Sequence, residues 1–235
     1  MNFKGENITM TDIKKAIVWG DSVAKGVVYD ESRSRYALSK SSAVKLVAEA
    51  LDIEIVNRSR MGMTANEGLE MLRKDISGGM SADVAIIEFG GNDCDFDWRL
   101  ISETPHEVHL PKTTAEVFEN KMKMMISEVR AAGMRPYLVT LPPIDAEKYF
   151  DFISRDGLSK ENILEWLGDK NHIYRYHERY SVLISKIARE MGTKLLDVRA
   201  TFLGLWNSNR LFCKDGIHPT DEGQRVIAEA VLASI

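Results

Sequence analysis

The chain has 235 residues, and its 31 Lys and Arg against 35 Asp and Glu give a formal charge of −4 with neutral histidines. A chain of this length buries roughly 70% of its unfolded surface, which is enough for a core that needs no disulfide or metal support. The two cysteines exclude a disulfide framework, and the slight acidity without any basic tract argues against a nucleic-acid partner.

Neither end of the chain resembles a targeting segment. Residues 1–7 lack the basic region and apolar stretch of a secretory signal. No window approaches the roughly 20 apolar residues that cross a bilayer. We therefore expect a cytoplasmic protein without stable membrane insertion.

In the first half of the chain, short apolar runs alternate with longer amphipathic stretches, which indicates βαβ units and a parallel sheet. The near-continuous apolar run 84–89 is typical of a central strand. The pattern predicts strands over 16–20, 53–57 and 84–89, and helices over 42–51 and 66–76.

The second half continues the alternation. Thr113-Thr114-Ala115-Glu116 is a capping-box pattern that predicts the start of a helix ending at Gly133. Pro142-Pro143 ends the next strand, because proline cannot donate to a ladder. The pattern predicts strands over 136–141 and 194–198, a helix over 171–191, and a last helix from Pro219 to Leu232.

The chain shows no internal repeat, low-complexity segment or flexible linker, so we expect a single domain over residues 1–235. Two connections, 94–112 and 144–170, are unusually long for an α/β domain. Long loops beyond strand ends commonly form lids and substrate walls, so we expect both to flank the active site.

Ligands of an open parallel sheet bind beyond the carboxyl ends of its strands. Polar segments follow four of the predicted strands, and all four should therefore meet at one edge of the sheet. They are Gly20-Asp21-Ser22, the stretch Asn57 to Thr64, Gly90-Gly91-Asn92-Asp93, and Asp215-Gly216-Ile217-His218.

These segments hold the parts of a serine hydrolase. Ser22 is the candidate nucleophile, His218 the candidate base, and Asp215 the carboxylate that orients His218. The backbone N–H groups of Ser22 and Gly62, with the side-chain amide of Asn92, form a plausible oxyanion hole.

The same residues resemble the SGNH hydrolases, also called the GDSL esterase and lipase family. The Gly-Asp-Ser block, Gly62, the Gly-x-Asn-Asp block and the Asp-x-x-His block occur in family order between about Ile17 and Ile227. The resemblance implies a three-layer α/β/α sandwich with five parallel strands in flavodoxin-like order, and hydrolysis through an acyl-serine intermediate without metal or cofactor. Val23 replaces the leucine of the family name, which is a mild change.

Several residues have an alternative structural interpretation. Gly-Asp-Ser alone is a common turn, and Asp93 is expected to brace its loop rather than to catalyse. Phe96 and Trp98 are candidate substrate-binding aromatics that could instead anchor the loop. Cys94 and Cys213 could bridge the cleft, although a cytoplasmic chain favours reduced thiols.

The remaining histidines are weaker candidates. His106 and His109 lie near Asp95 and Asp97, but their spacing favours solvated loop residues over a metal site, so no metal is predicted. His172 and His177 fit a half-buried helix face better than a proton relay.

We thus expect a serine esterase acting on a small-molecule ester with a short acyl, acetyl-sugar or lysolipid group. The alternative is a non-catalytic ligand-binding module on a flavodoxin-like fold. The stretch after the first strand lacks the phosphate loops of flavodoxins and P-loop proteins, and Asp21 there would repel a phosphate.

Overall fold

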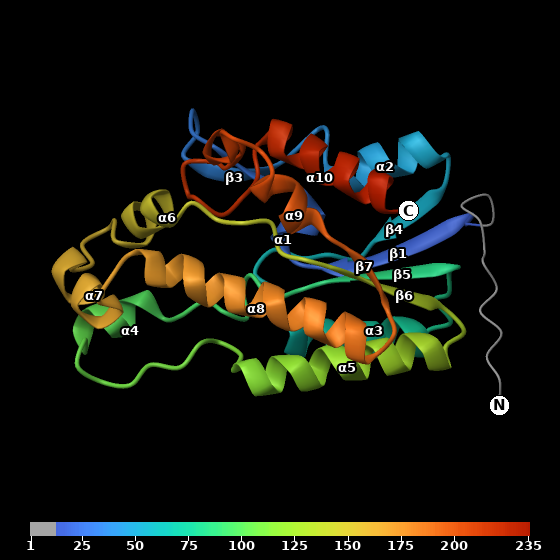
Figure 1. Ribbon diagram of the computed structural model, residues 1–235, viewed down its shortest axis with the longest axis horizontal. Helices are drawn as coiled ribbons and strands as arrows, with labels where there is room; N and C mark the ends of the chain where they lie inside the picture. Colours follow the sequence, from blue (N-terminus) through green and yellow to red (C-terminus); the bar gives the residue numbers. More distant parts are fainter. Residues whose placement is uncertain (1–12) are drawn as a thin grey trace.

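The computed structural model describes residues 13–235, so the N-terminal segment examined for a targeting signal lies outside the described residues. A five-stranded sheet with parallel pairing throughout forms its centre, in the spatial order β4-β1-β5-β6-β7 (Figure 1). This is the flavodoxin-like order, and the expected three-layer α/β fold is confirmed. The strands are β1 (Lys15–Gly20), β4 (Glu54–Asn57), β5 (Val84–Glu88), β6 (Arg135–Val139) and β7 (Lys194–Leu196).

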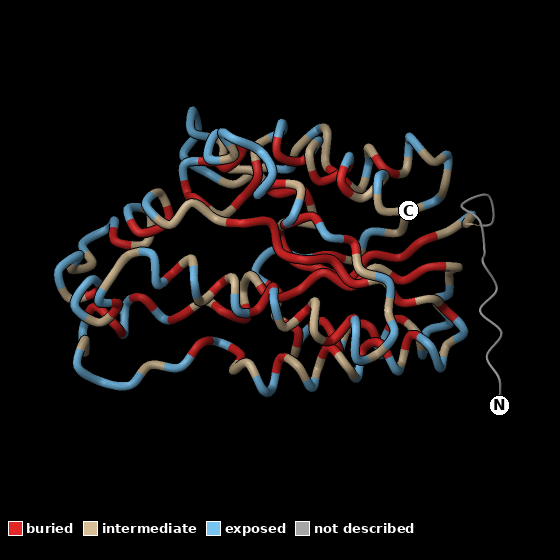
Figure 2. The backbone as a smooth tube through the Cα atoms, viewed as in Figure 1, coloured by how far each residue is buried: buried red, intermediate tan, exposed pale blue. Residues whose placement is uncertain are grey.

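Helices cover both faces of the sheet, so the central strands β1, β5 and β6 are largely buried, whereas the edge strands β4 and β7 are partly exposed (Figure 2). One face carries α2 (Ala43–Leu51), α9 (Val198–Leu203) and α10 (Asp221–Ser234). The other carries α3 (Ala65–Ser77), α5 (Ala115–Ala131) and α8 (Asn171–Glu190). Large apolar side chains between the layers, such as Trp19, Ile87 and Phe118, are fully buried, and each stabilises the fold by about 1.5–3 kcal/mol.

The helix starts differ in detail from the sequence pattern. The capping box predicted at Thr113–Glu116 is wrong, because Thr114 is the N-cap residue of α5 and makes no side-chain capping bond. Thr113 is instead buried, and its N–H donates to the backbone oxygen of Asp93. The last helix starts two residues after Pro219, with Thr220 as its N-cap.

Two further features follow β1. A four-residue helix, α1 (Ser22–Lys25), begins at the end of this strand. An antiparallel hairpin of β2 (Val27–Asp30) and β3 (Arg35–Leu38) comes next, and the sequence pattern did not predict it. Much later in the chain, the 3-10 helix η2 (Ser208–Leu211) precedes the Asp-x-x-His segment.

The two long connections contain helices, so the expectation of plain loops is corrected. The first includes α4 (Trp98–Glu103), and the second includes α6 (Ala146–Ile153) and α7 (Lys160–Leu167). These helices lie beyond the carboxyl ends of the strands, beside the start of α8 (Figure 1). They share a hydrophobic cluster, called the aromatic cluster below, whose aromatic members are Phe96, Trp98, Tyr149, Phe150, Trp166 and Tyr176.

Cys94 and Cys213 are both buried free thiols, and the disulfide weighed from the sequence does not form. Among residues 13–235, no helix combines the length and the apolar character that a membrane crossing requires.

Candidate active site

Three predicted catalytic side chains form a continuous hydrogen-bonded chain. His218 Nε2 lies 2.9 Å from Ser22 Oγ, and His218 Nδ1 lies 2.6 Å from Asp215 Oδ2. All three residues are buried. A carboxylate on one imidazole nitrogen leaves the other free to accept the serine proton, which is the arrangement of a nucleophile activated by a base.

The turn that carries Asp215 and His218 is fixed by its own backbone. Asp215 Oδ1 accepts hydrogen bonds from the N–H groups of Ile217 and His218, at 3.1 and 3.0 Å. Gly216 has φ +77°, and a Cβ there would lie 2.5 Å from the backbone oxygen of Asp145. The turn therefore needs glycine for both its conformation and its close approach to α6.

Ser22 is the first residue of α1, where a backbone N–H has no intrahelical acceptor. The side chain of Asp21 caps the helix by accepting from the Val23 N–H at 2.8 Å. Gly26 ends it in the left-handed conformation. The short helix thus holds the Ser22 hydroxyl and N–H at the edge of the sheet.

The candidate oxyanion donors come from three strand ends. Gly62 has φ +78°, and no atom lies within 4 Å of the place where a Cβ would be, so its backbone faces open space. The Asn92 amide donates to Asp21 Oδ2 at 3.2 Å and to the Met63 oxygen at 3.3 Å. Both distances are long for N–H···O bonds, so these weak bonds can be exchanged for a stronger acceptor.

Asp93, next to Asn92, has the bracing contacts expected from the sequence. Its carboxylate accepts from the Ala65 N–H at the start of α3, at 2.9 and 3.1 Å. Burial raises the pKa of Asp93 to about 6. The residue ties the loop after β5 to α3 and does not face the nucleophile.

Glu88 lies beneath the nucleophile loop, and the sequence analysis did not single it out because it ends an apolar strand. Its Oε2 accepts from the Asp21 N–H at 3.2 Å, while its Oε1 is buried without a partner among the described residues. Burial, together with the charge of Asp21, raises the pKa of Glu88 well above its usual range. This shift favours the neutral acid form of Glu88.

Tyr36, from the unpredicted hairpin, also contacts the site. Its ring centroid lies 5.0 Å from that of His218, with the two planes at 59°. Burial and the charge of Asp215 raise the pKa of the Tyr36 phenol, so it stays protonated. No motif in the sequence marked this contact, because it depends on how the hairpin folds back over the sheet edge.

Two spaces meet at Ser22. One is a small, partly open cavity of about 80 Å³ between the strand ends and the aromatic cluster, called the small cavity below, and the other is a wider and more open cleft of about 440 Å³. Gly62, Tyr36 and Arg155 line only the cleft. The residues that line both spaces are Ser22, Asn92, Asp95, Trp98, Tyr149, Ile217 and His218.

The predicted substrate-binding aromatics line this region and also anchor it. Phe96 lines the small cavity, and Trp98 lines both spaces. Both are buried in the aromatic cluster, and the Trp98 indole N–H lies 2.9 Å from Asp95 Oδ1 and 3.2 Å from the Tyr149 hydroxyl. Both residues therefore anchor this region, and their role in substrate binding stays a prediction.

The other histidines lie apart from the catalytic chain. His106 is exposed, and His109 Nε2 lies 2.8 Å from the Thr104 oxygen. His177 is buried on the face of α8 that packs against the rest of the protein, and it lines the small cavity. Within residues 13–235, no three His, Cys, Asp or Glu side chains are grouped to hold a metal ion.

This fold, with its serine at the first strand end and the Asp-x-x-His turn before the last helix, defines the class of SGNH hydrolases. The chain belongs to the GDSL-like lipase/acylhydrolase family, whose model matches residues 18–226. No curated protein sequence matches it significantly.

Solved structures show the same fold at low sequence identity. A lipase/acylhydrolase from Enterococcus faecalis is 19% identical, with a TM-score of 0.65 and 95% of each chain covered. A variant of an acetyl xylan esterase from Geobacillus stearothermophilus is 18% identical, with a TM-score of 0.64, covering 95% of this chain and 94% of that chain.

Proposed function

We propose that the protein is a serine ester hydrolase that acts through an acyl-Ser22 intermediate. The observation that carries the proposal is the hydrogen-bonded chain from Ser22 Oγ through His218 to Asp215, at 2.9 and 2.6 Å. A serine hydroxyl is a weak nucleophile at neutral pH unless a base within hydrogen-bond reach takes its proton. His218 meets that requirement.

In the acylation step, Ser22 Oγ forms a bond to the ester carbonyl carbon while its proton moves to His218 Nε2. The carbonyl oxygen becomes the oxyanion of a tetrahedral intermediate. The carbon–oxygen bond to the alcohol then breaks, and the leaving oxygen takes the proton from His218 Nε2. Asp215 stabilises the imidazolium that exists between these two transfers.

In the deacylation step, water replaces the alcohol. It attacks the acyl carbon as His218 Nε2 takes its proton, and the collapse of the second intermediate returns a proton to Ser22 Oγ. The open cleft suits the exit of the alcohol and the entry of water, because Ser22 and His218 both line it.

The oxyanion is stabilised by the N–H groups of Ser22 and Gly62 and by the Asn92 amide. Asn92 exchanges its 3.3 Å bond to the Met63 oxygen for the charged acceptor. A hydrogen bond to an ionised acceptor is roughly twice as strong as a neutral one, so the exchange favours the transition state.

The alternative, a non-catalytic binding module on the same fold, has weaker support. At the switch point of a flavodoxin-like sheet, where a nucleotide phosphate would bind, the chain instead has the buried Asp21 carboxyl and the Ser22–His218 pair. The ester substrates consistent with the family are short acyl esters, acetyl sugars and lysolipids.

Active-site labelling tests the proposal. Wild-type protein should hydrolyse p-nitrophenyl butyrate, and a fluorophosphonate probe should add once, at Ser22. Ser22→Ala should lose the adduct and at least about 10⁴-fold of kcat, with an unchanged melting temperature. An adduct elsewhere with Ser22 unmodified would refute the assignment.

A further inference from the structure

The small cavity beside Ser22 carries an inference about which acyl group the enzyme takes, and this inference rests on the proposed function. The cavity and the open cleft share the nucleophile, but they differ in access. An acyl group stays bonded to Ser22 between the two steps, whereas alcohol and water must pass in and out. The smaller and less open cavity therefore suits the acyl group, and the wider cleft suits the leaving group.

The size of the cavity limits that acyl group. A cavity of about 150 Å³ holds benzene, which has six carbon atoms, and the cavity here has about half that volume, 80 Å³. Its depth agrees with this limit. Exposed His172 and buried His177 both line it from α8, and five residues of helix rise about 7.5 Å. A chain of about four carbon atoms fits this space, and a lysolipid chain does not.

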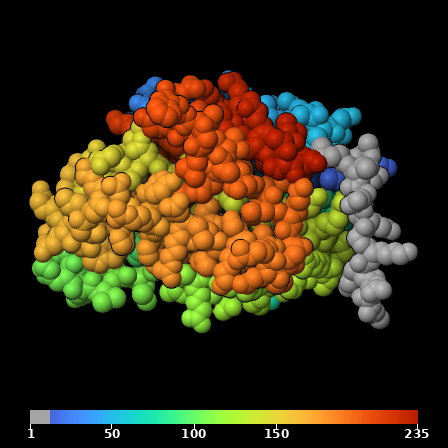
Figure 3. Space-filling view, in the orientation of Figure 1, coloured from blue at the N-terminus to red at the C-terminus, as the bar shows by residue number. Residues whose placement is uncertain are grey.

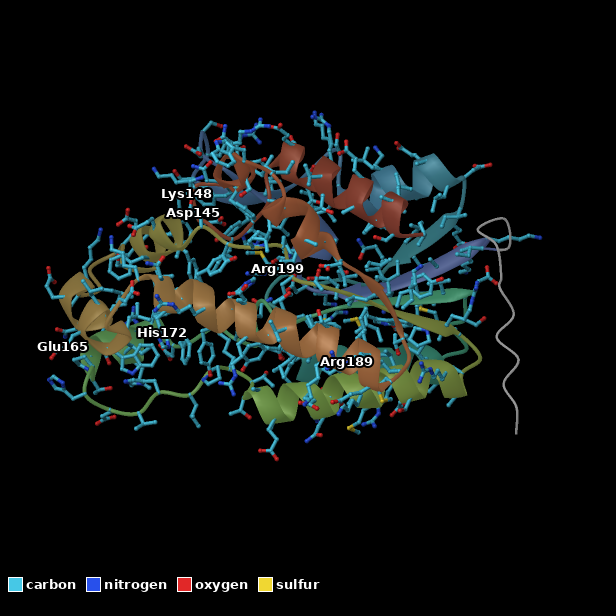
Figure 4. All side chains as sticks on the ribbon, in the orientation of Figure 1. Asp145, Lys148, Glu165, His172, Arg189 and Arg199 are labelled. Carbon is cyan, nitrogen blue, oxygen red and sulfur yellow. The ribbon has the colours of Figure 1, made fainter. Side chains whose placement is uncertain are left out.

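The face that α8 presents to the aromatic cluster begins near α7, where Figure 4 places His172. His172, Ile173, Tyr176 and His177 all line the cavity from this helix, at spacings that share one face. In the view of Figure 3, segments from α6 to α8 in yellow and orange cover this side of the molecule.

The walls are apolar apart from a few groups, and two of these have unpartnered atoms. His177 is 7% exposed and its Nδ1 has no hydrogen-bond partner among the described residues. Glu88 is 3% exposed, and its Oε1 is equally unpartnered. A buried polar atom without a partner is destabilising, so a ligand that supplies a partner gains affinity.

The His177 imidazole is neutral at pH 7, and the surroundings of Glu88 favour its neutral acid form. Burial and the nearby charge of Arg199 lower the pKa of His177 to about 3, and burial raises that of Glu88. Arg199 itself lies between α9 and α8 (Figure 4), and it is not among the residues that line the cavity. A neutral hydroxyl, which can both donate and accept, matches these groups better than a charged end group.

We propose that this cavity selects a short acyl chain of about four carbon atoms that carries a hydroxyl group, and that His177 is the specificity-determining residue that hydrogen-bonds this hydroxyl. The substrate class is thus the ester of a short hydroxy acid, such as a hydroxybutyrate.

The test compares kcat/KM for the ethyl esters of acetic, butyric, octanoic and 3-hydroxybutyric acid. Each hydrolysis is followed by titration of the acid that it releases. The kcat/KM of the butyrate ester should exceed those of the acetate and octanoate esters. The kcat/KM of the 3-hydroxybutyrate ester should exceed that of the butyrate ester by about fivefold, which corresponds to one neutral hydrogen bond. His177→Leu should remove this last preference, and His177→Gln, which keeps a hydrogen-bonding group, should retain part of it. His106→Leu, the same change at an exposed site, should leave every ratio unaltered.

The two proposals fail in different ways. If Ser22 takes no fluorophosphonate and no ester is hydrolysed, the proposed function is wrong. If Ser22 is labelled and esters are hydrolysed, but acetate or octanoate is preferred or His177→Leu keeps the hydroxyl preference, the cavity assignment is wrong. Ratios within one variant are compared, so a partial loss of folded protein does not affect the outcome.

Discussion

The catalytic edge and the aromatic cluster adjoin each other, yet different forces hold them. At the edge, Ser22, Asp215 and His218 are fixed by short hydrogen bonds to one another and to the backbone of their own turns. The aromatic cluster is fixed mainly by ring packing, for example Phe96 against Trp166 at 4.9 Å. Hydrogen bonds are directional and ring packing is much less so. The difference teaches that reaction geometry and substrate shape are specified by separate parts of the molecule.

The two regions meet at Asp95. Its Oδ1 accepts from the Tyr149 hydroxyl at 2.6 Å, and its Oδ2 pairs with Lys112 at 2.8 Å. Asp95 follows the Gly-x-Asn-Asp block by two residues, so one loop carries both an oxyanion donor and the anchor of the substrate wall. Substitutions on either side of this junction should separate catalysis from stability and specificity.

The largest separable effect is expected at Asn92. Asn92→Ala should lower kcat by about 10²–10³, with little change in KM or melting temperature, because its amide turns from the Met63 oxygen to the oxyanion only in the transition state. Steady-state kinetics and thermal unfolding of the same preparation measure both effects. An unchanged kcat would remove Asn92 from the oxyanion hole.

Asp93, the next residue, should show the opposite pattern. Asp93→Ala leaves the Ala65 N–H unpaired and should lower the free energy of unfolding by about 1–3 kcal/mol. At a temperature where the variant is folded, kcat should change little. A large loss of kcat in fully folded Asp93→Ala would show that this residue takes part in the chemistry.

His177 gives a pH-dependent effect on stability. Its pKa is lowered from 6.5 to about 3 in the folded state, so the unfolded chain binds the proton more tightly. Its contribution to stability is therefore complete above pH 6.5 and is lost as the pH falls from 6.5 towards 3. Urea unfolding measures the free energy of unfolding at pH 7.5 and at pH 5. Between these two pH values, the free energy of unfolding of His177→Leu should fall by about 2 kcal/mol less than that of the wild type. Equal losses in both proteins would contradict the buried neutral state.

Tyr36 should have a smaller effect on the catalytic edge. Its ring packs 5.0 Å from that of His218, where it can stabilise the imidazolium that forms during the reaction. Tyr36→Phe should keep the activity, and Tyr36→Leu should lower kcat about twofold to fivefold. Equal activity of all three proteins would show that the ring only covers the histidine.

No effect is expected from a chelator. The Ser22, His218 and Asp215 mechanism uses a base and hydrogen-bond donors, so it needs no Lewis acid. Prolonged dialysis against EDTA should leave kcat unchanged, measured with the ester used for Ser22→Ala. Loss of activity that zinc or manganese restores would overturn the serine mechanism.

The sheet and the catalytic edge were accessible from the sequence because their signals are local. The apolar run 84–89 and the short Asp-x-x-His turn each specify a conformation within a few residues. The hairpin at 27–38 was missed because its two strands have four residues each and are mostly half-buried, which leaves no clear alternation. Helices α4, α6 and α7 were missed for a similar reason, since six to eight residues show little helical periodicity.

The functional residues that the sequence did not indicate depend on long-range packing. Tyr36 reaches His218 across 182 positions of the chain, since 218 − 36 = 182. Glu88 and His177 have no distinguishing neighbours in the sequence, and only their burial beside the cavity marks them. No local pattern could have revealed these contacts.

Gly216 directly links the turn of the catalytic histidine to helix α6, which belongs to the aromatic cluster. Its carbonyl oxygen accepts from the Asp145 N–H at 2.8 Å, and a side chain at this position would strike α6. Any exchange of the 144–170 segment with that of a relative, in evolution or in the laboratory, must therefore preserve this contact. A replaced segment that shifts the start of α6 by about an ångström would also displace the turn that holds His218. New substrate specificity is therefore most readily gained by replacing α7 while α6 is retained.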